Sequence, residues 1–242
     1  MQLSWAEREL MEAIRDARTR RYTLKSRGEA WNVDLAGAYR VQAALQAGPV
    51  KGYKLGLISP AKQAQMGITS PIWGRLPARM LPDGSVSLQA FLQPRVEPEV
   101  AVVLRDPVGP DATPGAAWSA VAGFVLCADV LDSVWEGYRF TAAEVVADNA
   151  SGGACLLGER LLAPDQLQGS LRLYLNGRLA AEGPVASLGD PALQLCWLAR
   201  QTGGLAPGQV VPLGSPASAV PLEPGLVEVA LGDTCLVCQV QA

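Results

Sequence analysis

The chain has 242 residues and a formal net charge of −3, and that length is enough to bury one sizeable hydrophobic core. No cluster of lysines and arginines stands out, so the sequence lacks the electrostatic signature of a nucleic-acid-binding protein. No apolar run is long enough for a signal peptide or a membrane span. We therefore expect a soluble, cytoplasmic protein that associates with neither nucleic acid nor a membrane.

Residues 1–48 are predicted to form an N-terminal helical segment. Ser4 followed by Glu7 matches a capping box, and apolar residues then recur at helical spacing. A second helix is predicted from about Asp34 to Gln46, and the Gly-Pro pair at 48–49 ends it.

Residues 49–242 are predicted to form a β-rich catalytic body within one folding unit. Short apolar runs broken by glycine and proline are typical of strands, and Asn176-Gly177 is a strong turn signal. Helices are expected at 59–65, 114–120 and 191–202. The predicted class is α+β, mainly β, and the predicted strand runs are YKLGLI, SVSLQAF, VEPEVAVVL, AGFVLCADVL, GACLLG, LRLYLNG, QVVPLG, LVEVALG and CLVCQV.

Histidine is absent from the sequence. Its absence excludes the Ser-His-Asp and Cys-His arrangements, the H-E-x-x-H zinc site and an imidazole acid or base. Any catalysis must therefore use carboxylates, lysine, tyrosine, hydroxyls or a metal held by oxygen ligands.

The five cysteines do not form a recognisable disulfide or zinc pattern. Their spacing is irregular, unlike the framework of a small secreted domain. Cys235 and Cys238 form a C-x2-C, but in a strand-like run residues i and i+3 face opposite ways, and no second pair accompanies them. Because a closed zinc site needs four ligands, reduced thiols fit better.

Two glutamates in the strand-like run QPRVEPEVAVVL carry the main chemical signal. Glu97 and Glu99 are two residues apart, so in an extended chain their carboxylates share a face. One interpretation is a solvated edge strand, which Pro98 supports because proline in sheets is confined to edges, ends and bulges. The other adds Asp129, which follows a similar apolar run. Three converging carboxylates form a hard, oxygen-rich site suited to Mg²⁺ or Mn²⁺.

Two further segments contain polar residues that could act in the site. Lys54 lies between Tyr53 and Leu55 in an apolar strand, so its amine either extends to the surface or is buried with its pKa shifted toward a catalytically useful value. Residues 145–153, VVADNASGG, are either a turn or a functional segment, since Asp, Asn, Ser and Gly favour turns for local reasons.

Taken in order, these segments resemble the fumarylacetoacetate hydrolase superfamily, in its branch of 2-keto-4-pentenoate hydratases and 4-oxalocrotonate decarboxylases. The resemblance runs nearly end to end, through AYRVQ, GYKLGLISPAKQAQMGITSPIWGRL, PRVEPEVAVVL, ADVLDS, ADNASGGACLLG and the segment from LNGRLAAEG to PLEPG. It implies a mixed β-roll or sandwich fold with an N-terminal helical segment, and a role in aromatic compound catabolism.

The resemblance also implies roles for individual residues. Glu97, Glu99 and Asp129 would bind one Mg²⁺ or Mn²⁺, and Lys54 would transfer protons near the substrate. Ser151 would contact the substrate as a second catalytic residue. The neighbouring Asp148 and Asn149 would take part in substrate binding.

This chain departs from the branch at two positions. Asp129 stands where the branch usually has glutamate, and Val134 follows Asp132-Ser133 where arginine is common. Loss of that arginine would remove a cation able to hold a second carboxylate. We therefore favour hydration of a 2-hydroxypenta-2,4-dienoate-type compound to a 4-hydroxy-2-oxo acid over decarboxylation of a 4-oxalocrotonate-type 2-oxo dienedioate.

Other functions remain as alternatives. Acylpyruvate hydrolysis is weakened because members with that activity use a histidine-containing N-terminal segment. A divergent member with an altered reaction and a non-catalytic partner in a complex are also open, although a scaffold has no physical reason to keep three charges at a core edge. The expected partners are a small 2-oxo or 2-hydroxydienoate substrate and further copies in a homo-oligomer. A complex with a pathway enzyme is a further option.

Overall fold

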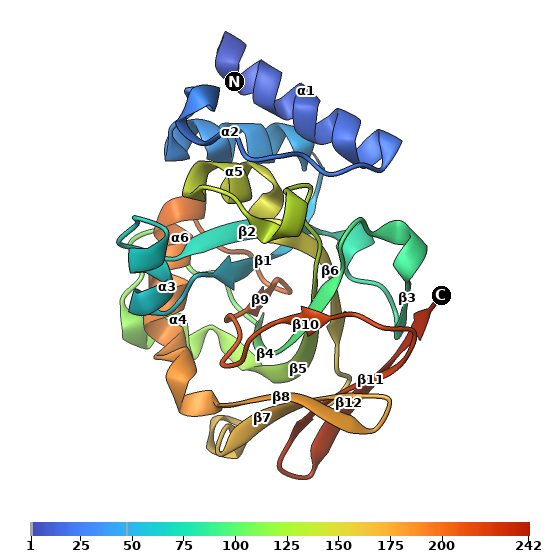
Figure 1. Cartoon of the computed structure of the whole chain (residues 1–242). Coiled ribbons are helices and arrows are strands. Elements are labelled where there is room, and N and C mark those ends of the chain that lie inside the picture. Colours follow the sequence, from blue (N-terminus) through green and yellow to red (C-terminus); the bar gives the residue numbers. More distant parts are fainter. Residues whose placement is uncertain (1, 47) are drawn as a thin grey trace.

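Figure 1 shows the computed structural model of the chain, which describes residues 2–46 and 48–242. Two helices pack against each other at one end of the molecule (Figure 1). The first begins with the predicted capping box, in which Ser4 Oγ accepts a hydrogen bond from Glu7 N and the Glu7 carboxylate accepts one from Ser4 N. These helices are α1 (Trp5–Arg20) and α2 (Leu35–Leu45).

The larger sheet has the strand order β2-β1-β9-β4-β5-β6, and the two-residue strand β10 also pairs with β4. All of its neighbouring strands are antiparallel except β1 and β9. Its strands are β1 (Val50–Gly56), β2 (Ile72–Pro77), β4 (Arg95–Leu104), β5 (Val121–Leu131), β6 (Gly152–Leu157), β9 (Val210–Pro212) and β10 (Val220–Pro221).

The smaller sheet has the order β3-β12-β11-β7-β8, and only the β12–β3 pair is parallel. It lies at the end of the molecule opposite α1 and α2 (Figure 1). Its strands are β3 (Ser85–Ser87), β7 (Ser170–Leu175), β8 (Arg178–Pro184), β11 (Gly225–Leu231) and β12 (Thr234–Gln241).

In the described residues, four further α-helices and six 3-10 turns connect strands, and a seventh 3-10 turn, η1, lies between α1 and α2. The helices are α3 (Pro60–Gln65), α4 (Pro114–Ser119), α5 (Ala142–Ala147) and α6 (Pro191–Thr202). The 3-10 turns are η1 (Gly28–Trp31), η2 (Ala78–Met80), η3 (Leu88–Ala90), η4 (Glu136–Tyr138), η5 (Asn149–Ser151), η6 (Pro164–Gln166) and η7 (Val185–Leu188).

The hydrophobic core is divided among three clusters of buried side chains. The largest contains apolar residues from both sheets together with α4 and α6. A second cluster joins α1 and α2 to α5, with Leu10, Ile14 and Trp135 among its fully buried members. The N-terminal helices therefore pack on the β-rich body through α5 and β2, where Gln42 Nε2 of α2 donates to Trp73 O at 2.9 Å.

The mainly β fold predicted from the sequence is confirmed, and so are the helices predicted near 34–46 and at 191–202. Among the strands and α-helices of the described residues, four were missed, namely β2, β8, β10 and α5. The strand predicted over SVSLQAF was wrong in its second half, because the strand ends at Ser87. The Ser87 side chain accepts a hydrogen bond from Gln89 N, and a 3-10 turn begins there.

The sequence argued against two features, a zinc site at Cys235 and Cys238 and a membrane span, and the structure bears on both. Cys235 is exposed and Cys238 is buried on β12, so the two thiols face opposite ways as expected. Within the described residues, no helix has both the length and the apolar composition that crossing a membrane requires.

Candidate metal centre and substrate cavity

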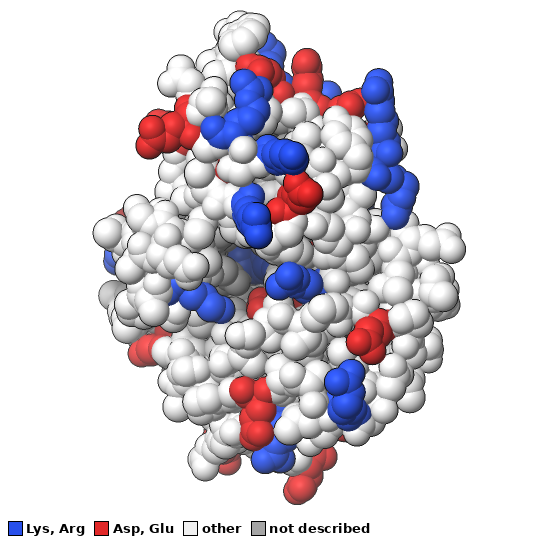
Figure 2. Space-filling model, viewed as in Figure 1, with Lys and Arg blue, Asp and Glu red and all other residues white. Residues whose placement is uncertain are grey.

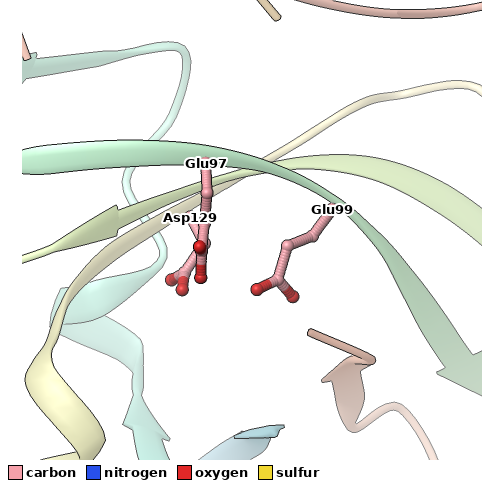
Figure 3. A group of neighbouring side chains, drawn as sticks. All are labelled: Glu97, Glu99 and Asp129. Carbon is pink, nitrogen blue, oxygen red and sulfur yellow. The ribbon is translucent and has the colours of Figure 1, made fainter. Parts of the chain in front are cut away.

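The register of β4 with β5 brings three carboxylates together. Glu97 lies opposite Asp129 and Glu99 lies opposite Cys127, and residues opposite each other in an antiparallel pair project to the same face. Figure 3 shows Glu97 and Glu99 on one strand and Asp129 on its neighbour, with all three side chains on the same side of the ribbon. One oxygen of each carboxylate lies within 4.8 Å of the others.

Pro98 does not mark a solvated edge strand, so that interpretation of the glutamates was wrong. β4 lies inside the sheet, with β5 on one side and β9 and β10 on the other. Pro98 falls in the gap between the residues that β9 and β10 pair. There Ser215 Oγ donates to Pro98 O at 2.9 Å. Because the N and O of one residue point to the same side of a strand, the missing N–H of Pro98 removes no bond of the β4–β5 ladder.

The donor set fits a hard divalent cation. Glu99 Oε2 accepts a hydrogen bond from Gly214 N at 3.0 Å, but Glu99 Oε1 and Asp129 Oδ1 are buried with no hydrogen-bond partner among the described residues. An unpaired carboxylate oxygen in a protein interior is costly. Carboxylate oxygens without histidine or thiolate are the ligands that Mg²⁺ and Mn²⁺ prefer.

Lys54 lies beside the carboxylates and is not at the surface. Its side chain is 2% exposed and its Nζ forms an ion pair with Asp129 Oδ2. Burial alone lowers the pKa of Lys54, but the charges of Asp129, Glu99 and Glu97 outweigh it and raise the pKa above its ordinary value. Of the two interpretations of Lys54, burial is confirmed, but the expected shift of its pKa toward a catalytically useful value was wrong, because the carboxylates raise the pKa and the amine carries a positive charge.

The two glutamates hold protons more tightly than ordinary carboxylates. Burial, followed by repulsion from Asp129, raises the pKa of Glu97 to about 7. Burial and repulsion from Asp129 and Glu97 raise the pKa of Glu99 well above its usual range. The cluster therefore has too little positive charge to keep all three carboxylates ionised.

A cavity of about 430 Å³ opens beside the carboxylates, lined by Lys54, Glu97 and Ser151. Figure 2 shows this side of the molecule hollowed near its middle, with basic side chains in and beside the hollow. Apolar side chains also line the cavity, among them Leu57, Ile72, Phe140 and Val145. Such a mixture of apolar walls and a few convergent polar groups is typical of a small-molecule site.

The sequence missed two cations that line this cavity, Arg95 and Lys62. Arg95 precedes Glu97 by two residues and so shares the face of the carboxylates, a signal that could have been used. Its guanidinium carbon lies 4.6 Å from the ring centre of Tyr138, which also lines the cavity. Val134, in contrast, is fully buried in the core cluster with Trp135. We inferred loss of a cation because Val134 stands where arginine is common, and this side chain points into the core.

The residues of the ADNAS segment lie in different environments. Ser151 lines the cavity, and its buried Oγ has no hydrogen-bond partner in the described part of the chain. The Asn149 side chain instead donates to Arg75 O at 2.9 Å and accepts from Arg75 N at 2.7 Å. The Asp148 carboxylate bonds Arg18 and Val134 N. Ser151 thus lines the cavity together with Lys54 and Glu97. Asp148 and Asn149 are not among the residues that line it.

A family model described as the fumarylacetoacetate hydrolase C-terminal region matches residues 57–241. This chain belongs to the fumarylacetoacetate hydrolase family. The matched range contains the three carboxylates and Ser151, whereas α1, α2 and Lys54 precede it.

Curated relatives within the family are lyases of two kinds. A 4-oxalocrotonate decarboxylase of Pseudomonas sp. is 33% identical over 183 residues, which cover 72% of each chain. A 2-hydroxypent-2,4-dienoate hydratase of Pseudomonas putida is 31% identical over 212 residues, covering 81% of this chain and 95% of the hydratase. The family and branch predicted from the sequence are therefore confirmed.

Solved structures agree with this placement. The 4-oxalocrotonate decarboxylase of Pseudomonas putida G7, complexed with magnesium and adipate, superposes with a TM-score of 0.84 at 27% identity and covers 97% of each chain. A second structure of that enzyme contains calcium and acetate, with a TM-score of 0.85. Divalent cations are therefore found in structures of a family member with this fold.

Proposed function

We propose that this chain is a divalent-metal-dependent lyase that hydrates a 2-hydroxypenta-2,4-dienoate-type compound to a 4-hydroxy-2-oxo acid. The observation that carries the proposal is the group of three register-paired carboxylates, with two unpaired buried oxygens, beside a buried lysine and an open cavity. Hydratases among the curated relatives act on this class of compound by name, including one of which this chain covers 95%.

Glu97, Glu99 and Asp129 would hold the Mg²⁺ or Mn²⁺. When bound, such a cation acts as a Lewis acid that draws negative charge from the substrate's oxygens. Family members have been solved with magnesium, with calcium, and, in a fumarylpyruvate hydrolase of Pseudomonas aeruginosa, with Mn²⁺. The cation would also supply the positive charge that the carboxylate cluster lacks.

Lys54 and Ser151 would act on the substrate itself. The Lys54 amine would move a proton to or from the dienol, which converts the dienol to a conjugated ketone to which water adds at C4. The unpaired hydroxyl of Ser151 would form a hydrogen bond to a substrate oxygen and fix its orientation. Leu57 and Phe140 would enclose the carbon chain and limit the entry of water.

Decarboxylation of a 2-oxo dienedioate is the second candidate, and Arg95 and Lys62 favour it. Within residues 2–46 and 48–242, neither side chain forms an ion pair with a carboxylate, although both line the cavity. A dicarboxylate substrate needs such a cation at the end remote from the metal. The decarboxylase relative was solved with adipate, a dicarboxylate.

Association remains a prediction. Large apolar side chains on the smaller sheet are about half exposed, namely Leu179 on β8, Leu226 on β11 and Val237 on β12. They support the homo-oligomer expected from the sequence, because exposed apolar side chains on a sheet face favour protein contacts. A complex with a pathway enzyme is likewise a prediction.

An ultraviolet assay with Mg²⁺ tests the two reactions. The purified protein is offered 2-hydroxypenta-2,4-dienoate and 4-oxalocrotonate separately, and loss of the conjugated chromophore is followed. Metal-dependent loss with the first compound is expected for the hydratase, and release of carbon dioxide from the second identifies the decarboxylase. No turnover of either compound by the Mg²⁺-loaded protein contradicts both assignments.

Glu97→Gln tests the metal site, and the exposed Glu159 supplies the control. Glu97→Gln is expected to abolish Mg²⁺ binding and turnover with little change in the circular dichroism spectrum, whereas Glu159→Gln changes neither. Retention of metal and full activity by Glu97→Gln contradicts the metal assignment.

A further inference from the structure

Three consecutive residues before β6 adopt left-handed backbone conformations without a glycine among them. Asn149, Ala150 and Ser151 have φ values of 55°, 52° and 53°. Each such residue costs about 1–2 kcal/mol, because its Cβ crowds the following carbonyl oxygen. Such a strained segment persists only where the surrounding structure holds it in place. Its contacts therefore indicate which groups the fold holds in position.

The backbone of Ser151 is fixed from both sides by aspartates. Its N–H donates to Asp148 O at 3.1 Å, and its carbonyl accepts from Asp132 N at 2.8 Å. Between these bonds the Oγ stays buried, unpaired and directed to the substrate cavity. The placement of the hydroxyl therefore depends on where Asp132 and Asp148 lie.

One arginine from the N-terminal helix α1 joins these two aspartates. Arg18 Nη1 donates to Asp132 Oδ2 at 2.9 Å, and Arg18 Nη2 donates to Asp148 Oδ1 at 2.6 Å. Both carboxylates are about 1% exposed. Two buried carboxylates near each other are unstable without a cation, and a planar guanidinium can bond both at once.

The other oxygens of the two carboxylates hold the chain that surrounds the site. Asp132 Oδ1 accepts from Leu92 N at 2.9 Å and from Gln93 N at 2.8 Å, just before β4. Asp148 Oδ2 accepts from Val134 N at 2.9 Å. Arg18 therefore sits at the centre of a network that reaches the approach to β4, the end of β5 and the turn carrying Ser151.

We propose that Arg18 is a positioning residue for the reaction, which acts through Asp132 and Asp148 to hold the Ser151 hydroxyl toward the substrate. The proposal rests on the proposed function, in which Ser151 contacts the substrate. The proposal gives α1 a role in the active site, although α1 lies outside the matched family region at 57–241.

Attachment of α1 to the molecule does not by itself require Arg18. Leu10, Ile14 and Ala17 bury the apolar face of the helix. A second arginine, Arg40, pairs with Glu7 at the other end of α1 at 2.5 Å and bonds neither aspartate. Arg40 therefore provides a matched control, since it anchors the same helix without touching the network around Ser151.

A double-mutant cycle tests the proposal in the full chain with Mg²⁺ and whichever substrate is turned over. Ser151→Ala is expected to lower kcat/KM of the wild type by about tenfold or more, the value of one lost hydrogen bond to the substrate. In the Arg18→Gln background, the same substitution is expected to lower kcat/KM by less than about threefold, because the hydroxyl is no longer held in place. In the Arg40→Gln background it should keep its wild-type effect.

Mg²⁺ affinity, measured by calorimetry, separates positioning from general disruption. Arg18→Gln is expected to lower kcat while the Kd for Mg²⁺ stays within about twofold of the wild-type value, since Arg18 touches none of the three metal-binding carboxylates. If Arg18→Gln lacks the wild-type circular dichroism spectrum, the cycle is run with Arg18→Lys, which keeps one charge but cannot bond both aspartates as the planar fork does.

The outcomes distinguish this inference from the proposed function. An undiminished Ser151→Ala effect in the Arg18 variant overturns the positioning role and leaves the proposed function intact. No effect of Ser151→Ala in the wild type overturns both the positioning role and the catalytic role of Ser151. A reduced effect in both arginine backgrounds also overturns the inference, because it assigns the loss to helix docking.

Discussion

At the scale of single residues, the candidate site is defined by an imbalance of charge. Three carboxylates face one lysine, and burial together with repulsion from Asp129 raises the pKa of Glu97 to about 7. A divalent cation would neutralise the group when all three carboxylates are ionised. The same side chains that make the metal-free cluster costly therefore favour cation binding.

Metal affinity is expected to depend on pH through Glu97. Its pKa is raised to about 7 by burial and by Asp129, so below pH 7 a proton must leave before the cation binds. The apparent affinity for Mg²⁺ should fall by about tenfold or more for each pH unit below 7, because Glu99, whose pKa is also raised, must lose its proton as well. Calorimetry at pH 5.5 to 8.5 measures this, with proton release checked in buffers of different ionisation enthalpy. An affinity that is flat across this range contradicts the raised pKa.

Replacement of Lys54 separates proton transfer from metal binding. Lys54→Met removes the amine that pairs with Asp129, so turnover should fall by about 10²-fold or more. The Kd for Mg²⁺ should be unchanged or lower, because a competing cation has been lost. Lys51→Met, on the same strand β1 but exposed, is the control and should retain wild-type activity. Loss of Mg²⁺ binding in Lys54→Met would assign the lysine a role in holding the metal site together.

Much of the site could be predicted from residue spacing, and the remainder could not. Glu97 and Glu99 share a face because side chains alternate along a strand, and this period is local. The bonds from Arg18 to Asp132 and Asp148 join residues 114 and 130 positions apart. No local pattern encodes a contact at that separation, so the connection of α1 to these two aspartates emerged only from the fold.

At the scale of elements, the success of the strand predictions followed the continuity of apolar runs in the sequence. β5 and β12 are largely apolar runs and were predicted, although only β12 alternates buried and exposed residues. β2, IWGRLP, and β8, RLAAEGP, are interrupted by glycine and charged residues, so neither forms the short apolar run that indicates a strand. The helix α5 was missed because its second half belongs to residues 145–153, which were interpreted as a turn or a functional segment.

The close contact between β2 and the turn η5 gives a prediction at this scale. A Cβ added at Gly74 would lie 2.5 Å from Asn149 O and 3.2 Å from Lys54 Cγ. Gly74→Ala should therefore displace the Ser151 turn, lower the free energy of unfolding by about 1–3 kcal/mol and reduce turnover. Urea denaturation and the ultraviolet assay measure the two effects.

Gly115→Ala is the matched control for Gly74→Ala. Gly115 lies in α4, and a Cβ there would have no atom within 4 Å. Alanine is the better helix former, so the stability should rise by up to about 1 kcal/mol. Equal stabilities of the two variants would contradict the tight packing between β2 and the Ser151 turn.

At the scale of the whole molecule, the boundary predicted at residue 48 marks a change from helices to a mainly β structure. Apolar residues of α1 and α2 share one cluster with α5 and Trp135, and Arg18 connects α1 to the aspartates behind Ser151. Composition and periodicity locate such a boundary, but they do not reveal whether the two parts share a core. The single folding unit expected from the sequence is a prediction that unfolding experiments can test.

Leu10→Ala tests whether the N-terminal helices and the β-rich body unfold together. Leu10 is fully buried in the shared cluster, so the substitution should lower the free energy of unfolding by about 2–5 kcal/mol. Leu193→Ala, in α6 and 56% exposed, should change it by less than about 0.5 kcal/mol. Because both parts share the core, tryptophan fluorescence and circular dichroism should report one coincident urea transition in the wild type and in both variants. A separate early transition in Leu10→Ala, with the rest of the unfolding curve unchanged, would show that residues 1–48 fold independently of the body.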